Sequence, residues 1–171
     1  GQDLFDIPSN VLSGIKSLIE DFNPDVLIVH GDTTTTFAAS LAAFYKKIKI
    51  AHVEAGLRTY KLDSPWPEEA NRQLTGRLAD YHFAPTESAA ENLINEGKSR
   101  DCVFITGNTV IDALYRVLGK NRKESKEEDL VDLISNYGYK IYERDIILVT
   151  GHRRENFGQG FINICNALKE I

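Results

Sequence analysis

The chain has 171 residues, of which 42% are hydrophobic and 26% are charged, and its formal net charge at pH 7 is −5. This composition is typical of a folded globular protein with one domain or two small ones. It contains no basic block of the kind that binds nucleic acid, and no apolar run approaches the ~20 residues that a membrane helix needs. We therefore expect neither a nucleic-acid partner nor a membrane partner.

In the first part of the chain, apolar residues at helical spacing alternate with short runs rich in β-branched residues. In chain order, the pattern predicts a helix over 12–22, a strand over 26–29, a helix over 34–46, a strand over 48–53, a helix over 67–79, a strand over 81–84, a helix over 85–94 and a strand over 103–106. Strands that alternate with helices indicate an α/β fold with a right-handed, mostly parallel sheet.

The composition changes near 108–129, where we expect a second α/β unit to begin. The pattern then predicts a helix over 110–118, a loop over 119–129, a short helix over 130–137, a doubly buried strand over 146–150 and a final helix over 160–171. The two cysteines, Cys102 and Cys165, lie far apart and lack CxxC spacing. We expect both to be buried thiols, as suits a cytoplasmic protein.

The most informative stretch is 26–37, in which an apolar strand is followed by Gly31, Asp32 and four threonines. Gly31 supplies a tight turn, and the threonine hydroxyls can cap the helix that follows. Ligands of open α/β sheets bind outside the carboxyl ends of the strands, so we expect Asp32 to lie in a ligand cleft. The alternative is that Asp32 serves only as the cap of the helix.

Polar or ionisable side chains follow three predicted strands in the same way, and this recurrence is more informative than any one of them. The residues are His30 and Asp32, His52 and Glu54, and His152, Arg153 and Arg154. Several carboxylates and a histidine that converge on one cleft could perform general acid–base chemistry. Four arginines could balance these acids and bind a phosphate: Arg58, Arg72, Arg153 and Arg154.

The same residues also have structural explanations. Glu54 could be a solvated loop acid, and Glu68 and Glu69 could be first-turn acids that only complement a helix dipole. Three histidines beside strands are expected to be satisfied structural residues: His30, His52 and His82. No spacing matches a metal site, a P-loop or a GxGxxG turn, so we expect no metal and no nucleotide cofactor.

Five motifs together resemble those of the non-hydrolysing UDP-N-acetylglucosamine 2-epimerases. They are HGDTTTT (30–36), HVEAGLRT (52–59), SPWPEEANRQLTG (64–76), FITGNTVIDAL (104–114) and ILVTGHRREN (147–156). The resemblance implies a glycosyltransferase-B-like fold, in which two Rossmann-like domains enclose the active site. It implies that residues 1–108 are the later part of the N-terminal domain and that residues 109–171 begin the C-terminal domain, so both domains are incomplete here.

The family resemblance implies interconversion of UDP-GlcNAc and UDP-ManNAc without a metal or a nicotinamide cofactor. Elimination of UDP across C1–C2 gives a glycal, and re-addition of UDP with protonation of the other face of C2 inverts that centre. By their places in the motifs, Asp32, Glu54 and Glu68 are the carboxylates for this work, and His152 supports the departing UDP. Which carboxylate acts as the acid and which as the base stays open.

The same resemblance implies a set of residues that contact the UDP-sugar: Thr35, Arg72, Arg153, Arg154 and Glu155. It also implies a homodimer and a role in surface polysaccharide synthesis. The family's N-terminal phosphate-binding loop and its C-terminal Ser-Gly-Gly and glutamate, which hold uridine and ribose, do not occur in these 171 residues. We therefore expect this chain alone to be inactive.

Three other functions fit parts of this pattern. A hydrolysing relative would release ManNAc and UDP, a glycosyltransferase would need an acceptor, and a binding module would hold a UDP-sugar without chemistry. The intact HGDTTTT and PWPEEANR motifs argue against hydrolysis. The presence of all three acids and the histidine argues against a non-catalytic module.

Overall fold

A computed structural model describes residues 3–123, 127–139, 147, 149–150 and 158–170. Contacts divide the chain into two units, Gly1–Asn108 and Thr109–Ile171. No helix in the described ranges is both long enough and apolar enough to cross a membrane.

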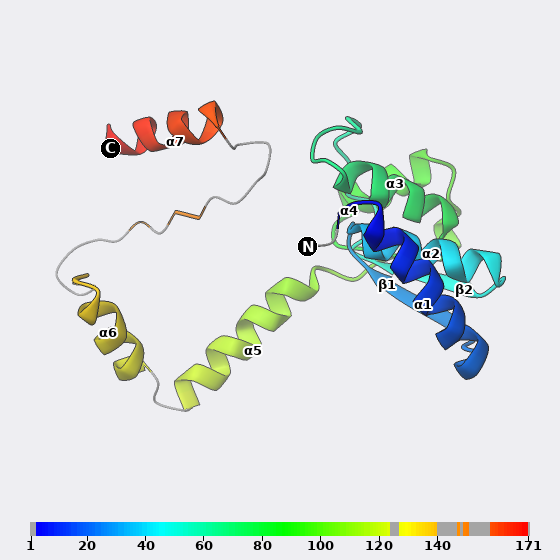
Figure 1. Cartoon of the computed structure of the whole chain (residues 1–171), viewed down its shortest axis with the longest axis horizontal. Helices are drawn as coiled ribbons and strands as arrows, with labels where there is room; N and C mark the ends of the chain where they lie inside the picture. Colours follow the sequence, from blue (N-terminus) through cyan, green and yellow to red (C-terminus); the bar gives the residue numbers. More distant parts are fainter. Residues whose placement is uncertain (1–2, 124–126, 140–146, 148, 151–157, 171) are drawn as a thin grey trace. The chain divides into compact units, whose positions relative to one another are not determined.

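Unit 1, coloured blue to green in Figure 1, is built on a four-stranded parallel sheet, as the alternating pattern predicts. Its strands are β1 (Val26–His30), β2 (Lys49–Val53), β3 (Tyr81–Ala84) and β4 (Val103–Ile105), and they lie side by side in chain order. His30 pairs with Val53, and Val53 pairs with Phe83, so the carboxyl ends of the first three strands lie at one edge. The prediction of an α/β fold is confirmed for this unit.

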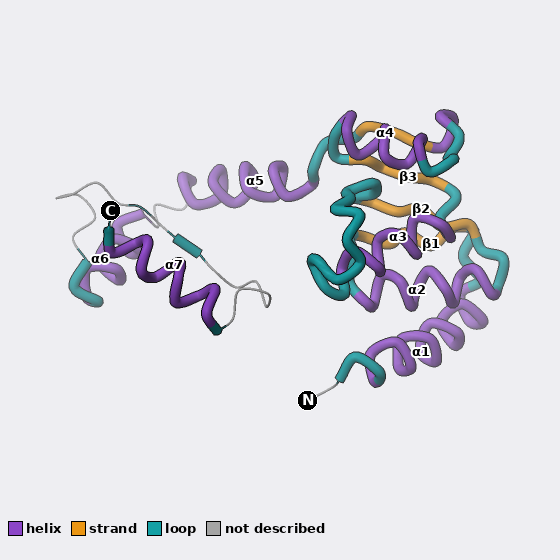
Figure 2. Tube along the Cα trace, turned by 90° about the horizontal axis from the view of Figure 1, so that it is seen from above, coloured by secondary structure: helices purple, strands orange, loops and turns teal. Residues whose placement is uncertain are grey.

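One helix of unit 1 precedes these strands and three connect them. They are α1 (Asp6–Phe22), α2 (Thr34–Tyr45), α3 (Glu68–Leu78) and α4 (Glu87–Asn95), with a 3₁₀ turn η1 (Arg100–Cys102) before β4. Figure 2 shows α1 beside α2, and their packing accounts for the helical spacing of apolar residues in α1. All four helices were predicted, although α1 begins six residues before the predicted start at 12.

One face of the sheet carries the core of unit 1. Val29 and Ile50 on this face pack with Ile19 of α1 and with Ala39 and Ala43 of α2. The alanines of α2 let its backbone lie close to the sheet, because a methyl group is the whole side chain. Alternate residues point to the opposite face, where Ile28 is 66% exposed although its neighbour Ala51 is buried.

Unit 2 contains three described helices: α5 (Thr109–Lys123), α6 (Glu127–Asn136) and α7 (Gln159–Lys169). The predicted loop over 119–129 is wrong, because α5 continues to Lys123 and α6 starts at Glu127. The run of Lys, Arg and Glu there has good helix propensity, which outweighs its polarity. Of the predicted strand 146–150, residues 147, 149 and 150 are in no strand and the other two lie outside the described residues.

The prediction of two buried thiols is also wrong. Cys102 is partly exposed and Cys165 is exposed, and neither forms a disulfide. Cys102 is the last residue of the short 3₁₀ turn η1, and its thiol lies 3.1 Å from the carbonyl oxygen of Ser99.

Candidate active site

A threonine caps helix α2 after the turn that follows β1, and this shows whether Asp32 serves as the helix cap. Thr33 is the N-cap of α2, and its hydroxyl accepts a hydrogen bond from the Thr36 amide at 3.2 Å. Thr36 in turn donates its hydroxyl to the carbonyl oxygen of His30 at 2.7 Å. Gly31 takes a φ of 75°, as the predicted tight turn requires. The explanation of Asp32 as the helix cap is therefore wrong.

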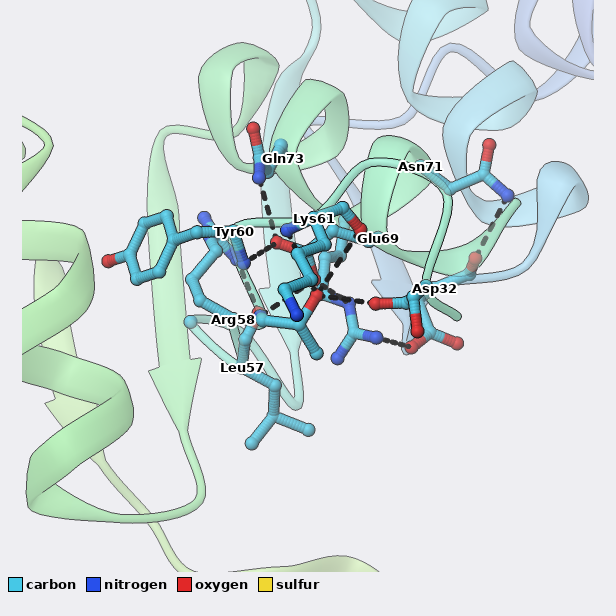
Figure 3. A network of polar contacts seen from close by, with 12 residues as sticks. Asp32, Leu57, Arg58, Tyr60, Lys61, Glu69, Asn71 and Gln73 are labelled. Carbon is cyan, nitrogen blue, oxygen red and sulfur yellow. Dashed lines mark hydrogen bonds and ion pairs between the residues drawn. The ribbon is translucent and has the colours of Figure 1, made fainter. Parts of the chain in front are cut away.

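Two side chains of α3 hold Asp32 (Figure 3). Asn71 donates its amide to the Asp32 carbonyl oxygen at 3.0 Å. Arg72 Nη2 lies 3.6 Å from Asp32 Oδ2, and both α3 residues are buried. The backbone and the carboxylate of Asp32 are thus fixed from the same turn of one helix.

Glu69 is the most enclosed acid of the site, with a fully buried side chain (Figure 3). Its carboxylate accepts hydrogen bonds from the amides of Thr59 and Tyr60 at 3.1 and 3.0 Å, and from Gln73 Nε2 at 2.7 Å. Arg72 Nε lies 3.1 Å from Glu69 Oε2, an ion pair without hydrogen-bond geometry. Glu69 therefore joins the segment before α3 to the arginine that faces Asp32.

These contacts determine the protonation of Glu69. Burial by itself raises the pKa of its carboxyl, but the hydrogen bonds from Gln73, Thr59 and Tyr60 and the charge of Arg72 outweigh burial and lower the pKa. Glu69 is therefore a carboxylate at neutral pH. Glu69 does lie in the first turn of α3, but the alternative that it only complements the helix dipole is wrong, because its carboxylate accepts three hydrogen bonds and pairs with Arg72.

Glu54 lies directly after β2 and takes a positive φ of 65°, which is uncommon for a residue with a side chain. Its carboxylate lies 3.2 Å from His30 Nε2 at the end of the neighbouring strand. The Glu54 side chain is 30% exposed, so it faces both a protein group and solvent. His30, expected to be structural, is thus the partner of a candidate catalytic acid.

The two other strand histidines of unit 1 lie in the interior. His52 Nε2 donates to the carbonyl oxygen of Gly31 at 2.8 Å, which supports the turn before Asp32. Neither ring nitrogen of His82 has a hydrogen-bond partner among the described residues, so the expectation of a satisfied histidine is wrong there. Burial lowers the pKa of each ring to about 4, and both are neutral at pH 7.

The other residues predicted for the site are exposed or partly exposed, are paired elsewhere, or lie outside the described residues. Glu68 is the first residue of α3 and is partly exposed, and Thr35 is exposed in the first turn of α2. Arg58 pairs with Glu96 through two hydrogen bonds of 2.7 and 2.9 Å and not with the acids of the site. Four predicted residues lie outside the described residues: His152, Arg153, Arg154 and Glu155.

The arrangement offers acid–base groups and no metal centre in the part of the chain that the structure describes. No group of three or more His, Cys, Asp or Glu side chains there could hold a metal ion. Asp32 and Glu54 follow adjacent parallel strands, and Glu68 opens the helix whose next turn contacts Asp32. Carboxylates placed in this way can take a proton from a bound substrate or return one to it.

Comparison with known proteins identifies the family. The sequence profile of the UDP-N-acetylglucosamine 2-epimerases matches residues 1–171. The chain belongs to this family. UDP-N-acetylglucosamine 2-epimerases of Campylobacter jejuni and Escherichia coli K12 are 57% and 54% identical to it over 99% and 100% of its length. The chain spans 45% of the length of each of these relatives.

Solved structures of epimerases agree with this assignment. The UDP-GlcNAc 2-epimerase of Neisseria meningitidis bound to UDP-GlcNAc matches 99% of the chain and 45% of its own, with a TM-score of 0.92 and 50% identity. The enzyme of Methanocaldococcus jannaschii, in complex with UDP-GlcNAc and UDP, matches the same shares with a TM-score of 0.80 and 35% identity. The predicted glycosyltransferase-B-like α/β class is thus confirmed through these epimerases.

The sequence did not predict the roles of three residues around the candidate acids. Asn71 and Glu69 lie in the same motif as Glu68, and His30 opens the motif that contains Asp32. The spacing of Glu69 and Arg72 by three residues on a helix was a usable signal, because such pairs meet on one face. No local pattern indicates that Glu69 also binds the amides of Thr59 and Tyr60.

Proposed function

We propose that the protein containing this chain interconverts UDP-GlcNAc and UDP-ManNAc by inverting C2 of the sugar. The observation that carries the proposal is the placement of Asp32 and Glu54 after adjacent parallel strands of an epimerase-family chain. Glu68 is the third carboxylate, at the start of the helix that holds Asp32. The two family members solved with UDP-GlcNAc support the choice of substrate.

The C2 hydrogen has no neighbouring carbonyl group to acidify it, so its removal by a base is coupled to the departure of UDP. A base removes the C2 proton, the electron pair of that bond forms the C1–C2 double bond, and the C1–O bond breaks toward UDP. The released UDP oxygen then attacks C1 of the glycal, and an acid delivers a proton to the other face of C2. Asp32, Glu54 and Glu68 are the groups that we assign to these proton transfers.

The nucleotide part of the substrate needs positive charge and hydrogen-bond donors. We assign His152 to the departing UDP, and we assign contacts with the substrate to Thr35, Arg72, Arg153, Arg154 and Glu155. Thr35 lies in the exposed first turn of α2, where a helix N-terminus favours anions. Arg153 and Arg154 suit a diphosphate because a guanidinium binds two oxygens at once. Arg72, which lies between Asp32 and Glu69, is assigned to the sugar side of the substrate.

We further propose that residues 1–108 and 109–171 belong to two Rossmann-like domains of the whole protein. The division of contacts at Asn108 supports this boundary. On family grounds we propose a cytoplasmic homodimer that supplies ManNAc units for surface polysaccharides. The absence of a disulfide at Cys102 and Cys165 suits a reducing compartment.

Product analysis of the full-length protein tests this function. Incubation with UDP-GlcNAc, followed by proton NMR of the sugar anomeric signals, is expected to give UDP-ManNAc and an equilibrium mixture. Free ManNAc together with UDP would identify a hydrolysing enzyme instead. Binding of UDP-GlcNAc with no product at all would identify a non-catalytic module.

A further inference from the structure

We propose that Glu69 is a positioning residue of this site, which acts by holding the Arg72 guanidinium against Asp32. The proposal rests on the proposed function, since it concerns the acid–base chemistry at Asp32. None of the family motifs assigns this role by itself, because Glu69 lies beside Glu68 and looks like a second helix-start acid. Its contacts are what separate the two glutamates.

The first step is the contrast between neighbouring side chains of α3. Glu68 is partly exposed, whereas the Glu69 side chain is 0% exposed and receives three hydrogen bonds. A buried carboxylate is unfavourable unless its oxygens are paired, and here the pairing is complete enough to keep it charged. Glu69 is therefore a fixed negative charge in the protein, not an acid that meets the substrate.

The second step is the orientation of Arg72. Its Nε lies 3.1 Å from Glu69 and its Nη2 lies 3.6 Å from Asp32, so a single guanidinium lies between the two carboxylates. The guanidinium is planar, and holding one of its nitrogens fixes the direction of the others. With the Arg72 side chain 10% exposed, little solvent competes for these contacts.

The third step is the segment that leads from Glu54 to α3. Glu69 also accepts from the amides of Thr59 and Tyr60 in that segment. A purely structural role would consist of this anchoring alone. A positioning role requires in addition that loss of the Glu69 charge reaches Asp32 through Arg72.

This arrangement predicts that loss of Glu69 affects catalysis and UDP binding to different extents. Two carboxylates already neighbour the Arg72 charge, so its main effect is expected on the reactive state of Asp32 and not on the hold on UDP. Loss of Glu69 should therefore lower kcat for hydrogen exchange at C2 while the Kd for UDP stays nearly constant. A phosphate-binding role for Arg72 predicts the reverse pattern.

The test uses Glu69→Gln in the full-length protein, with Glu96→Gln as the matched control. Glu96 also pairs with a buried arginine, Arg58, which lies in the segment after β2 and not on α3. We expect E69Q to lower the rate of C2 exchange by at least about tenfold, with the Kd for UDP changed less than about twofold. E96Q is expected to leave both within about threefold and to lower only the unfolding midpoint.

A double-mutant cycle with Arg72→Gln identifies the route of the effect. If Glu69 acts through Arg72, adding E69Q to R72Q lowers the rate by less than about threefold. Effects that multiply would overturn the proposal, and so would an E69Q enzyme with unchanged kcat. If E69Q does not fold, as judged by circular dichroism, Glu69→Asp takes its place with the same expectation.

An NMR measurement tests the positioning of Arg72 independently of the proposed epimerase function. The ¹⁵N Nε–Hε signal of Arg72, assigned by its loss in R72Q, is expected to be sharp in the parent and E96Q proteins and to shift or broaden in E69Q. An unchanged signal in E69Q would overturn the proposal. A parent protein that gives the expected signals but no C2 exchange would refute the function and leave the positioning of Arg72 supported.

Discussion

His30 Nε2 lies 3.2 Å from Glu54 Oε2, so a side-chain contact joins the ends of the neighbouring strands β1 and β2. His30 is the last residue of β1, and Glu54 is the first residue after β2. The contact places an imidazole nitrogen beside a carboxylate that we assign to proton transfer. The adjacent placement of β1 and β2 therefore brings His30 next to a residue that we assign to the reaction.

Replacing His30 with alanine is expected to lower the rate of C2 exchange by about tenfold, because Glu54 loses the group that orients it. The unfolding midpoint should change little, since the His30 side chain is 56% exposed. Arg100→Ala is the control, because it removes an ion pair to Glu91 in which the arginine side chain is 72% exposed. Equal rates for H30A and R100A would contradict this account of His30.

Gly56→Ala is expected to destabilise the protein by more than about 3 kcal/mol, because the added methyl group would collide with the Ala89 carbonyl of α4. Gly97→Ala is the matched control, with the same φ of 90° and no atom within 4 Å of the new methyl. It should lose only the backbone strain of about 1–2 kcal/mol. Urea unfolding measures both values, and equal losses would refute the steric explanation.

Two helices of unit 1 have a threonine N-cap. Removing each cap compares its effect on the stability of the fold with its effect on activity. Thr33 caps α2 beside Asp32, and Thr86 caps α4 by an equivalent bond of 3.1 Å to Ala89. Each Thr→Ala change is expected to lower the free energy of unfolding by about 1 kcal/mol. Only T33A should also slow C2 exchange, since it loosens the turn that carries Asp32. A similar slowing in T86A would contradict this.

Acid sensitivity is expected from the buried histidines. Because burial lowers the pKa of His82 from 6.5 to about 4 in the folded state, the unfolded chain binds a proton between these values and the folded chain does not. The stabilisation is complete above pH 6.5 and is lost as the pH falls toward 4, by roughly 3 kcal/mol at most.

His82→Leu should flatten this dependence, because leucine is apolar, suits a buried position and has no titratable group. The measurement is urea unfolding of the parent and H82L proteins at a series of pH values across that window. An unchanged difference in stability between the two ends of the window in H82L would show that His82 does not carry the effect.

Much of unit 1 was predictable because its strands are short apolar runs bounded by turn residues. Asp32 and Glu54 could be placed together from sequence, since the carboxyl ends of parallel strands share an edge of the sheet. Local chemistry also identified Gly31 as a turn residue, which its φ of 75° confirms. These predictions succeeded because each depends on residues within one strand and the turn after it.

The failures have a common physical cause, which is that burial depends on contacts between distant segments. Glu69 looks like a helix-start acid until the backbone of Thr59 and Tyr60 folds over it. His82 gives no local sign that both ring nitrogens stay without a partner in the described core. Cys165 was expected inside on residue type alone, and it is exposed on α7.

The most direct test of the central claim is incubation of the full-length protein with UDP-GlcNAc in D₂O. We predict deuterium at C2 of both UDP-GlcNAc and UDP-ManNAc, read by mass spectrometry and proton NMR. Asp32→Asn should abolish this incorporation while the circular dichroism spectrum stays that of the parent protein. Epimerisation without deuterium at C2, or incorporation that persists in D32N, would contradict the assignment of this carboxylate to proton transfer.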